Sequence, residues 1–247
     1  RHSMTPRDTP TGERLALLRR AWLRQLRYEW ASVNRDYLHG RLRPPILRID
    51  DAGARLGSWQ PEHRTLGISE AHILEDPWHE IGETLKHEMA HQVVDELYGG
   101  QDERPHGPLF DRAAEQLCLH TPIAEGPEAG RVLQRVRKLL ALAGSDNVHE
   151  AEAAMAKANT LLLRYNLELS VGGEDEPGAV GYRFLGGSSA AIALHRKMVA
   201  VILEQFFFVE CIWTSTYDSL RDQDQRILEI CGTPANLDFA THVHEYL

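Results

Sequence analysis

The seven residues Leu85 to His91, which read Leu-Lys-His-Glu-Met-Ala-His, constrain this chain more than any other stretch. Residues four apart lie on one face of an α-helix, so His87 and His91 can direct both imidazoles at one point. Zinc binds such pairs of helical histidines. Glu88 is rotated away from that point, which makes it a poor ligand and a suitable general base for water at the metal. The H-E-x-x-H pattern therefore predicts a zinc site in which Glu88 is the catalytic residue.

A structural histidine pair is the alternative, because thirteen histidines in 247 residues raise the number of chance matches. Two features favour a metal. Ile81, Leu85, Met89 and Val93 recur at helical spacing, which indicates a helix packed against a core. A third histidine, His106, follows in His-Gly-Pro-Leu-Phe. We predict that His87, His91 and His106 bind Zn²⁺. Glu115, on the next predicted helix, is a less favoured third ligand.

Length and composition exclude several classes of protein. A chain of 247 residues with 43% hydrophobic content can bury one large core or two smaller ones. Nothing approaches the run of about eighteen apolar residues that a membrane span needs, and the chain does not begin with a basic-then-apolar signal pattern. We therefore expect no membrane association and a cytoplasmic location. Three cysteines are too few and too scattered for a disulfide framework or a cysteine-type zinc site.

The charge is unevenly distributed. The net charge of −9 argues against indiscriminate binding of nucleic acid, but residues 1–48 carry eleven arginines against four acidic residues. Most of this stretch is predicted to be a long amphipathic helix over 12–38, with leucine and tryptophan on one face and Arg19, Arg20, Arg24 and Arg27 mainly on the others. This asymmetry suggests a basic surface at one end of the protein. A solvated arginine face is an equally good interpretation.

The order of the predicted elements gives an α+β domain over residues 12–120. After the first helix come three short strands, at 46–49, 55–59 and 65–68. The metal helix follows at 78–97, then a loop with His106, then a helix over 109–119. We expect an extended protein substrate to add to the edge of this small three-stranded sheet, near Thr65–Ser69. Asp95, one turn beyond His91, either orients that imidazole or is a plain surface acid.

Four ordered segments carry a family resemblance. They are Asn34-Arg35-Asp36-Tyr37-Leu38-His39-Gly40-Arg41-Leu42, Leu56-Gly57-Ser58-Trp59, Thr84-Leu85-Lys86-His87-Glu88-Met89-Ala90-His91 and His106-Gly107-Pro108-Leu109-Phe110. Together, over about residues 15–120, they resemble the SprT-like (Spartan) metallopeptidase family.

The resemblance implies a zincin-like fold, with His106 as the third zinc ligand. It also implies substrates that are proteins bound or crosslinked to DNA. Members often carry a cysteine-type zinc ribbon after the protease domain, for which this sequence has too few cysteines. A metzincin is excluded, because Val94 and Leu97 stand where that class needs glycine and histidine.

Two further modules are predicted after this domain. Residues 128–169 are predicted to be a helical hairpin domain that resembles a small family of unassigned function. Its basic residues either touch phosphate or form a solvated face. An acidic linker at 172–178 precedes a small α-β-β-α module over 181–247. In that module we predict a helix at 189–205, strands at 206–214 and 226–231, and a final helix from Thr233.

These features favour a zinc-dependent metalloendopeptidase that hydrolyses peptide bonds. The resemblance adds the hypothesis that its substrates are DNA-bound or DNA-crosslinked proteins, with the DNA held by the Arg-rich N-terminal helix over 12–38. A third hypothesis is a non-catalytic zinc-containing module that binds nucleic acid or protein.

Overall fold

The chain falls into two units in a computed structural model. The structure describes residues 10, 12–51, 55–100, 106–119 and 180–246, with isolated positions between 135 and 164. The first unit comprises Arg1–His120 and Thr216–Asp224, and the second comprises Thr121–Ser215 and Gln225–Leu247. The predicted linker at 172–178 and most of the predicted hairpin at 128–169 lie outside the described residues.

Helix α1 (Gly12–Leu38) forms where the sequence predicts it. Its apolar stripe is fully buried at Trp22, Leu26 and Leu38, because this face packs into the core of the first unit. The helix ends at Gly40, whose φ of 72° is left-handed and whose N–H reaches the Asn34 carbonyl at 2.9 Å.

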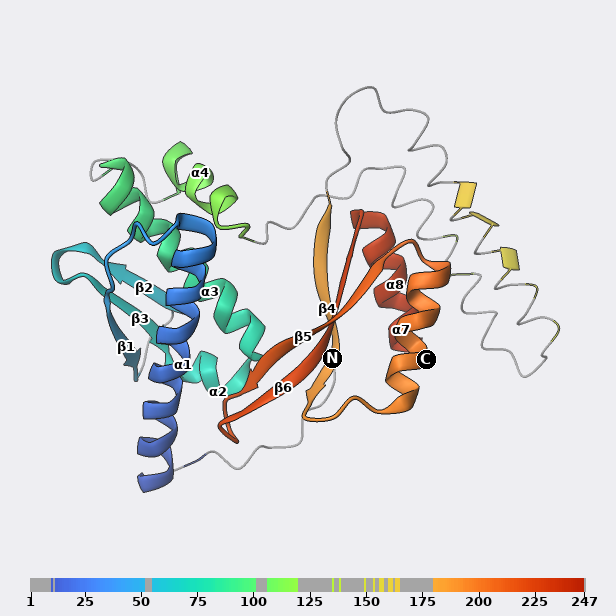
Figure 1. The fold of residues 1–247 in the computed structure, drawn as a ribbon, viewed down its shortest axis with the longest axis horizontal. Coiled ribbons are helices and arrows are strands. Elements are labelled where there is room, and N and C mark those ends of the chain that lie inside the picture. The colour runs from blue at the N-terminus through green and yellow to red at the C-terminus, as the bar shows by residue number, and fades with distance from the viewer. Residues whose placement is uncertain are drawn as a thin grey trace. The chain divides into compact units, whose positions relative to one another are not determined.

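The predicted three-stranded sheet is confirmed, but the predicted edge strand is wrong. Strands β1 (Ile46–Asp50), β2 (Gly57–Gln60) and β3 (Thr65–Ser69) are arranged in the order β1-β3-β2 (Figure 1). β3 pairs in parallel with β1 and antiparallel with β2, so it is the central strand and all five of its residues are buried. The short helix η1 (Pro61–His63) folds β2 back along β3 and leaves β2 at an edge.

Three helices follow the sheet. The short helix α2 (Glu70–Glu75) was not predicted, and α3 (Trp78–Val93) is the predicted metal helix. α3 continues into the π-helical turn Val94–Tyr98 and ends before Gly99, and α4 (Pro108–Gln116) comes next. Both α1 and α3 contact the sheet, and their apolar faces form one core with β3 and α4.

The C-terminal end of α3 is held by a buried polar network. Gln92, which is fully buried, accepts a hydrogen bond from Trp30 Nε1 at 3.1 Å and donates to Glu96 at 3.0 Å. The Glu96 side chain is 5% exposed and pairs with Arg64 at 2.6 Å. Burial alone would raise the pKa of Glu96, but hydrogen bonds from Gln92, Arg64 and the Arg43 backbone lower it below its ordinary value. The network ties α1, α3 and the β2–β3 turn together.

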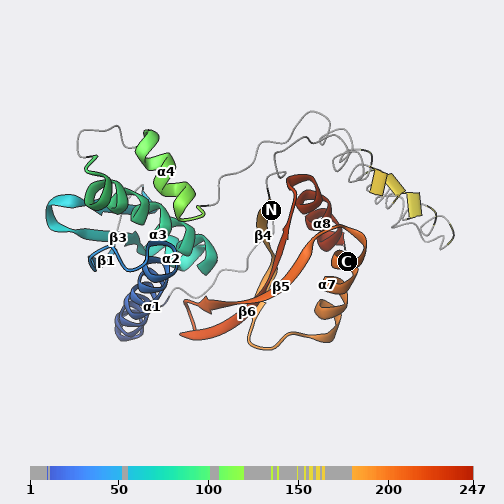
Figure 2. The same cartoon turned by 45° about the horizontal axis from the view of Figure 1, so that its top comes forward.

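The second unit contains a strand that the sequence analysis missed. Its elements are β4 (Gly181–Ser189), α7 (Leu194–Phe206), β5 (Glu210–Asp218), β6 (Gln223–Gly232) and α8 (Pro234–Tyr246). The strand order is β4-β6-β5, and α7 and α8 lie side by side on one face (Figure 2). The predicted α-β-β-α succession is present as α7, β5, β6 and α8, but β4 precedes it and the prediction is therefore incomplete. β4 ends in Gly-Gly-Ser-Ser, a loop-like composition, and it is stabilised by pairing with β6 about forty residues later.

No helix in the described part of the chain has the length and apolar character needed to cross a membrane.

Replacing Glu96 with alanine should destabilise the first unit by about 2 kcal/mol, because Arg64 would lose a buried, charge-assisted partner. Since the folded pKa of Glu96 is lowered, its contribution is fully present above the ordinary glutamate pKa and is lost as pH falls through the folded pKa. Urea unfolding at several pH values measures both effects. The exposed Glu62→Ala variant is the control. If the difference in free energy of unfolding between Glu96→Ala and the wild type does not become smaller in acid, the network does not have the proposed role.

Candidate metal centre

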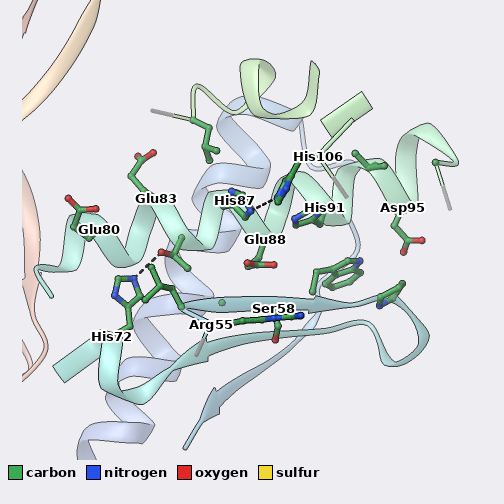
Figure 3. Close-up of a pocket in the computed structure, with 18 residues that line it drawn as sticks. Arg55, Ser58, His72, Glu80, Glu83, His87, Glu88, His91, Asp95 and His106 are labelled. Atoms are coloured by element: carbon green, nitrogen blue, oxygen red, sulfur yellow. Dashed lines mark hydrogen bonds between the residues drawn. The ribbon is translucent and has the colours of Figure 1, made fainter. Parts of the chain in front are cut away.

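Three imidazoles converge in the first unit. His87 and His91 come from successive turns of α3, and His106 comes from the residue before the Gly107 N-cap of α4. Nε2 of His106 lies 3.2 Å from Nε2 of His87 (Figure 3). One ligand atom from each of the three histidines lies within 4.8 Å of the others. The residues that the sequence predicts as metal ligands are thus brought together, and Glu115 is not part of this cluster.

The arrangement fits a zinc ion. Nitrogen ligands at 2.0–2.1 Å in a tetrahedron are separated by about 3.3 Å, close to the spacing of the His87 and His106 nitrogens. The Phe110 ring packs against all three imidazoles, with ring centroids 4.9, 4.6 and 4.7 Å from those of His87, His91 and His106. The H-G-x-x-F spacing therefore has a physical basis, since it places the aromatic residue one turn into α4, behind the third imidazole.

His87 and His91 are in the protonation state that a metal requires. Burial, followed by the neighbouring imidazoles, lowers the pKa of His91 to about 4. Burial and the proximity of His106 also lower the pKa of His87. Both rings are therefore neutral near pH 7 in the absence of metal, with lone pairs available for coordination.

Glu88 lies in the same cavity, on the side of α3 that faces β2 (Figure 3). The residue is only 7% exposed, and burial raises the pKa of its carboxyl group to about 7. A hydrogen bond from the Trp59 backbone N–H and the charge of Arg55 partly offset this rise. A carboxyl group with a pKa near the working pH can both accept and return a proton.

Gly57 lets the sheet approach this helix closely. A Cβ at position 57 would lie 2.8 Å from Cγ of Glu88 and 2.8 Å from Cγ2 of Thr84. Any other residue here would therefore displace β2 or one of these side chains. The Leu-Gly-Ser-Trp segment does not reveal a role for Gly57 or Trp59 in the sequence, because their contacts with α3 depend on tertiary packing.

A cavity of about 920 Å³ joins these groups. β2 and the two residues before it line one side, and α3 lines the other, with His72 toward one end and Asp95 toward the opposite end (Figure 3). Among the described residues, no hydrogen bond joins Asp95 to His91, and an orienting role for Asp95 stays a prediction. His72 and Thr84 were not predicted as site residues, since neither lies in the H-E-x-x-H pattern.

Comparison with known proteins assigns two parts of the chain. Residues 29–127 match the model of the SprT-like family. The chain carries a SprT-like domain. Residues 131–169 match the model of a protein of unknown function, DUF2786. Both resemblances inferred from the sequence are therefore confirmed.

The chain is also similar to a solved structure, the crystal structure of the metallopeptidase zymogen of Pyrococcus abyssi abylysin. That similarity has 22% identity and a TM-score of 0.29, and it covers 47% of this chain and 95% of the other. Comparison with curated proteins gives no match.

If the three histidines of the SprT-like domain bind zinc, His106→Ala should lower the affinity for zinc by more than ~100-fold, since losing a ligand should cost at least as much as losing a residue that only orients one. Competition with a chromophoric chelator measures this affinity. The control is His63→Ala, an exposed histidine in η1 that should change nothing. Wild-type zinc affinity in His106→Ala would exclude His106 as a ligand.

Proposed function

We propose that the SprT-like domain is a zinc-dependent endopeptidase with a zincin-like arrangement of metal helix and edge strand. The observation that carries the proposal is the convergence of three imidazoles beside a buried carboxyl group in one open cavity. A structural metal site needs no buried general base and no substrate-sized space beside the ligands. The family match supports metallopeptidase chemistry in the same stretch.

Strand β2 is suited to bind an extended chain. The Leu56 carbonyl accepts a hydrogen bond from the Ser69 N–H at 2.9 Å, and the register pairs Ser58 with Gly67. Backbone groups alternate in direction along a strand, so those of Gly57 and Trp59 point away from β3. The bond from the Trp59 N–H to Glu88 agrees with this alternation. A substrate strand would therefore pair with Gly57 and with the Trp59 carbonyl along the cavity, because the Trp59 N–H is already bonded to Glu88.

Different residues would carry out metal binding and proton transfer in peptide hydrolysis. His87, His91 and His106 would hold the zinc ion, which when bound polarises the scissile carbonyl and acidifies water. Glu88 takes the proton from the attacking water and returns it to the departing amine nitrogen. Its raised pKa suits both steps, because the carboxyl group is neither a very weak base nor a very strong acid.

The expected substrates are unfolded or flexible protein segments. Strand addition recognises the peptide backbone, so little selection of side chains is expected. A folded domain cannot present an extended strand to β2 without local unfolding. A cytoplasmic location for this activity stays a prediction.

Glu88→Gln should bind zinc like the wild type but lose between about 10²- and 10⁴-fold in the rate of casein cleavage, since the amide cannot accept the proton. The exposed Glu62→Gln variant should cleave at the wild-type rate. Zinc content is measured on the same samples. Equal cleavage by zinc-loaded wild type and Glu88→Gln would remove the endopeptidase proposal and favour the non-catalytic zinc module.

DNA-bound proteins are a narrower candidate class of substrate, and one surface favours it. Arg20, Arg24 and Arg27 are exposed at helical spacing on α1, next to Tyr28, which is 67% exposed. Arg24 pairs with Asp222, whereas Arg20 and Arg27 make no ion pair within the described ranges. Arg19 is already engaged by Glu70 and Asp51. Exposed guanidinium groups and an exposed aromatic ring on one helix suit a nucleic-acid strand.

If α1 binds DNA phosphates, the double variant Arg20→Gln/Arg27→Gln should reduce the magnitude of the slope of log K against log salt by about 1.4 for a single-stranded oligonucleotide. Arg48→Gln, whose arginine pairs with Asp50 on β1, is the matched control. Fluorescence anisotropy across a salt series gives the slopes. A DNA-binding role for this helix would be contradicted if the wild type does not bind the oligonucleotide, or if its affinity does not change with salt concentration.

A further inference from the structure

His72 is a buried imidazole whose two nitrogens both have partners. Its side chain is 3% exposed, Nδ1 lies 2.7 Å from Asp76 Oδ2, and Nε2 lies 2.9 Å from Thr84 Oγ1 (Figure 3). A carboxylate accepts from Nδ1–H, which leaves the Nε2 lone pair to accept from the Thr84 hydroxyl. The hydrogen-bond chain therefore runs from Thr84 through His72 to Asp76.

This chain of hydrogen bonds fixes the orientation of the Thr84 side chain. Threonine in a helix divides between two rotamers, because its hydroxyl can also bond to a backbone carbonyl one turn earlier. The bond to His72 selects the rotamer in which Oγ1 faces α2. The methyl group Cγ2 is then directed at Gly57, where a Cβ would lie only 2.8 Å away.

Thr84 and Glu88 are one turn apart on α3 and meet the same point of β2. A Cβ on Gly57 would lie 2.8 Å from Cγ of Glu88 and equally 2.8 Å from Cγ2 of Thr84. The Trp59 N–H, two residues along the strand, donates to the Glu88 carboxylate. The separation between β2 and α3 at Thr84 therefore also fixes where Glu88 sits relative to the strand.

We propose that His72, held by Asp76, is a positioning residue for the peptidase site, acting through Thr84 to set the spacing between strand β2 and Glu88. The inference rests on the proposed function, because it concerns the strand that would bind substrate and the base that would act on it. His72 itself contacts no reacting atom. It controls the geometry in which a strand paired with β2 presents its peptide bond to Glu88.

The test uses variants that separate the hydroxyl of Thr84 from its methyl group. Thr84→Val keeps the shape but cannot bond to His72, and Thr84→Ser keeps that bond. In the full chain loaded with zinc, Thr84→Val and His72→Ala should each lower kcat for an unfolded substrate between about 10- and 100-fold, with little change in KM. The double variant should be no worse than either single variant, because both break one chain. Thr84→Ser should retain most of the activity, and the exposed control His63→Ala all of it.

A second measurement does not depend on catalysis. Hydrogen exchange at the Trp59 amide reports the bond from β2 to Glu88, so Thr84→Val and His72→Ala should speed its exchange at least tenfold while Thr84→Ser does not. Faster exchange in a chain that cleaves no substrate would uphold the positioning role and reject the proposed function. Unchanged Trp59 exchange would overturn the positioning role. The positioning role would also be overturned if the loss of activity in each variant only matched its loss of folded protein. It would be overturned as well if the losses of the two single variants were additive in the double variant.

Discussion

The close approach of helix α3 to strand β2 is the contact on which the rest of the site depends. Gly57 makes it possible, because a side chain there would collide with Thr84 and Glu88. The contact buries the Glu88 carboxyl group, joins it to the Trp59 N–H and raises its pKa. It also places the strand that can receive a substrate next to the imidazoles of α3. A metal helix without this neighbour would be a binding site with no base held against an incoming peptide.

The surrounding fold keeps that contact in place from both ends of α3. Near its start, His72 on α2 bonds to Thr84. Near its end, Gln92 and Glu96 connect the helix to Trp30 on α1 and to Arg64 beside β3. Phe110 on α4 packs against all three imidazoles, which ties the loop histidine to the helix that carries the other two. Polar groups that would be costly to bury alone are here paired, so they specify one arrangement of helices on the sheet.

Local sequence patterns predicted most of the first unit, because its helices and strands are strongly periodic and the H-E-x-x-H spacing follows from helix geometry. The same patterns failed where a partner distant in the sequence decides the outcome. Strand order was mistaken at Thr65–Ser69, since three short strands do not reveal which of them is central. β4 was missed because its stability comes from β6. The roles of His72, Thr84 and Gly57 were not predicted, because they exist only once α2, α3 and β2 meet.

X-ray absorption at the zinc edge tests the central claim most directly, because it counts and identifies the atoms around the ion. For the zinc-loaded chain we predict a four-coordinate site of nitrogen and oxygen at about 2.0–2.1 Å, with the scattering signature of three imidazoles and none from sulfur. His106→Ala should show two imidazoles. A wild-type site with sulfur, with fewer than three imidazoles, or with no ordered zinc would contradict a centre built from His87, His91 and His106.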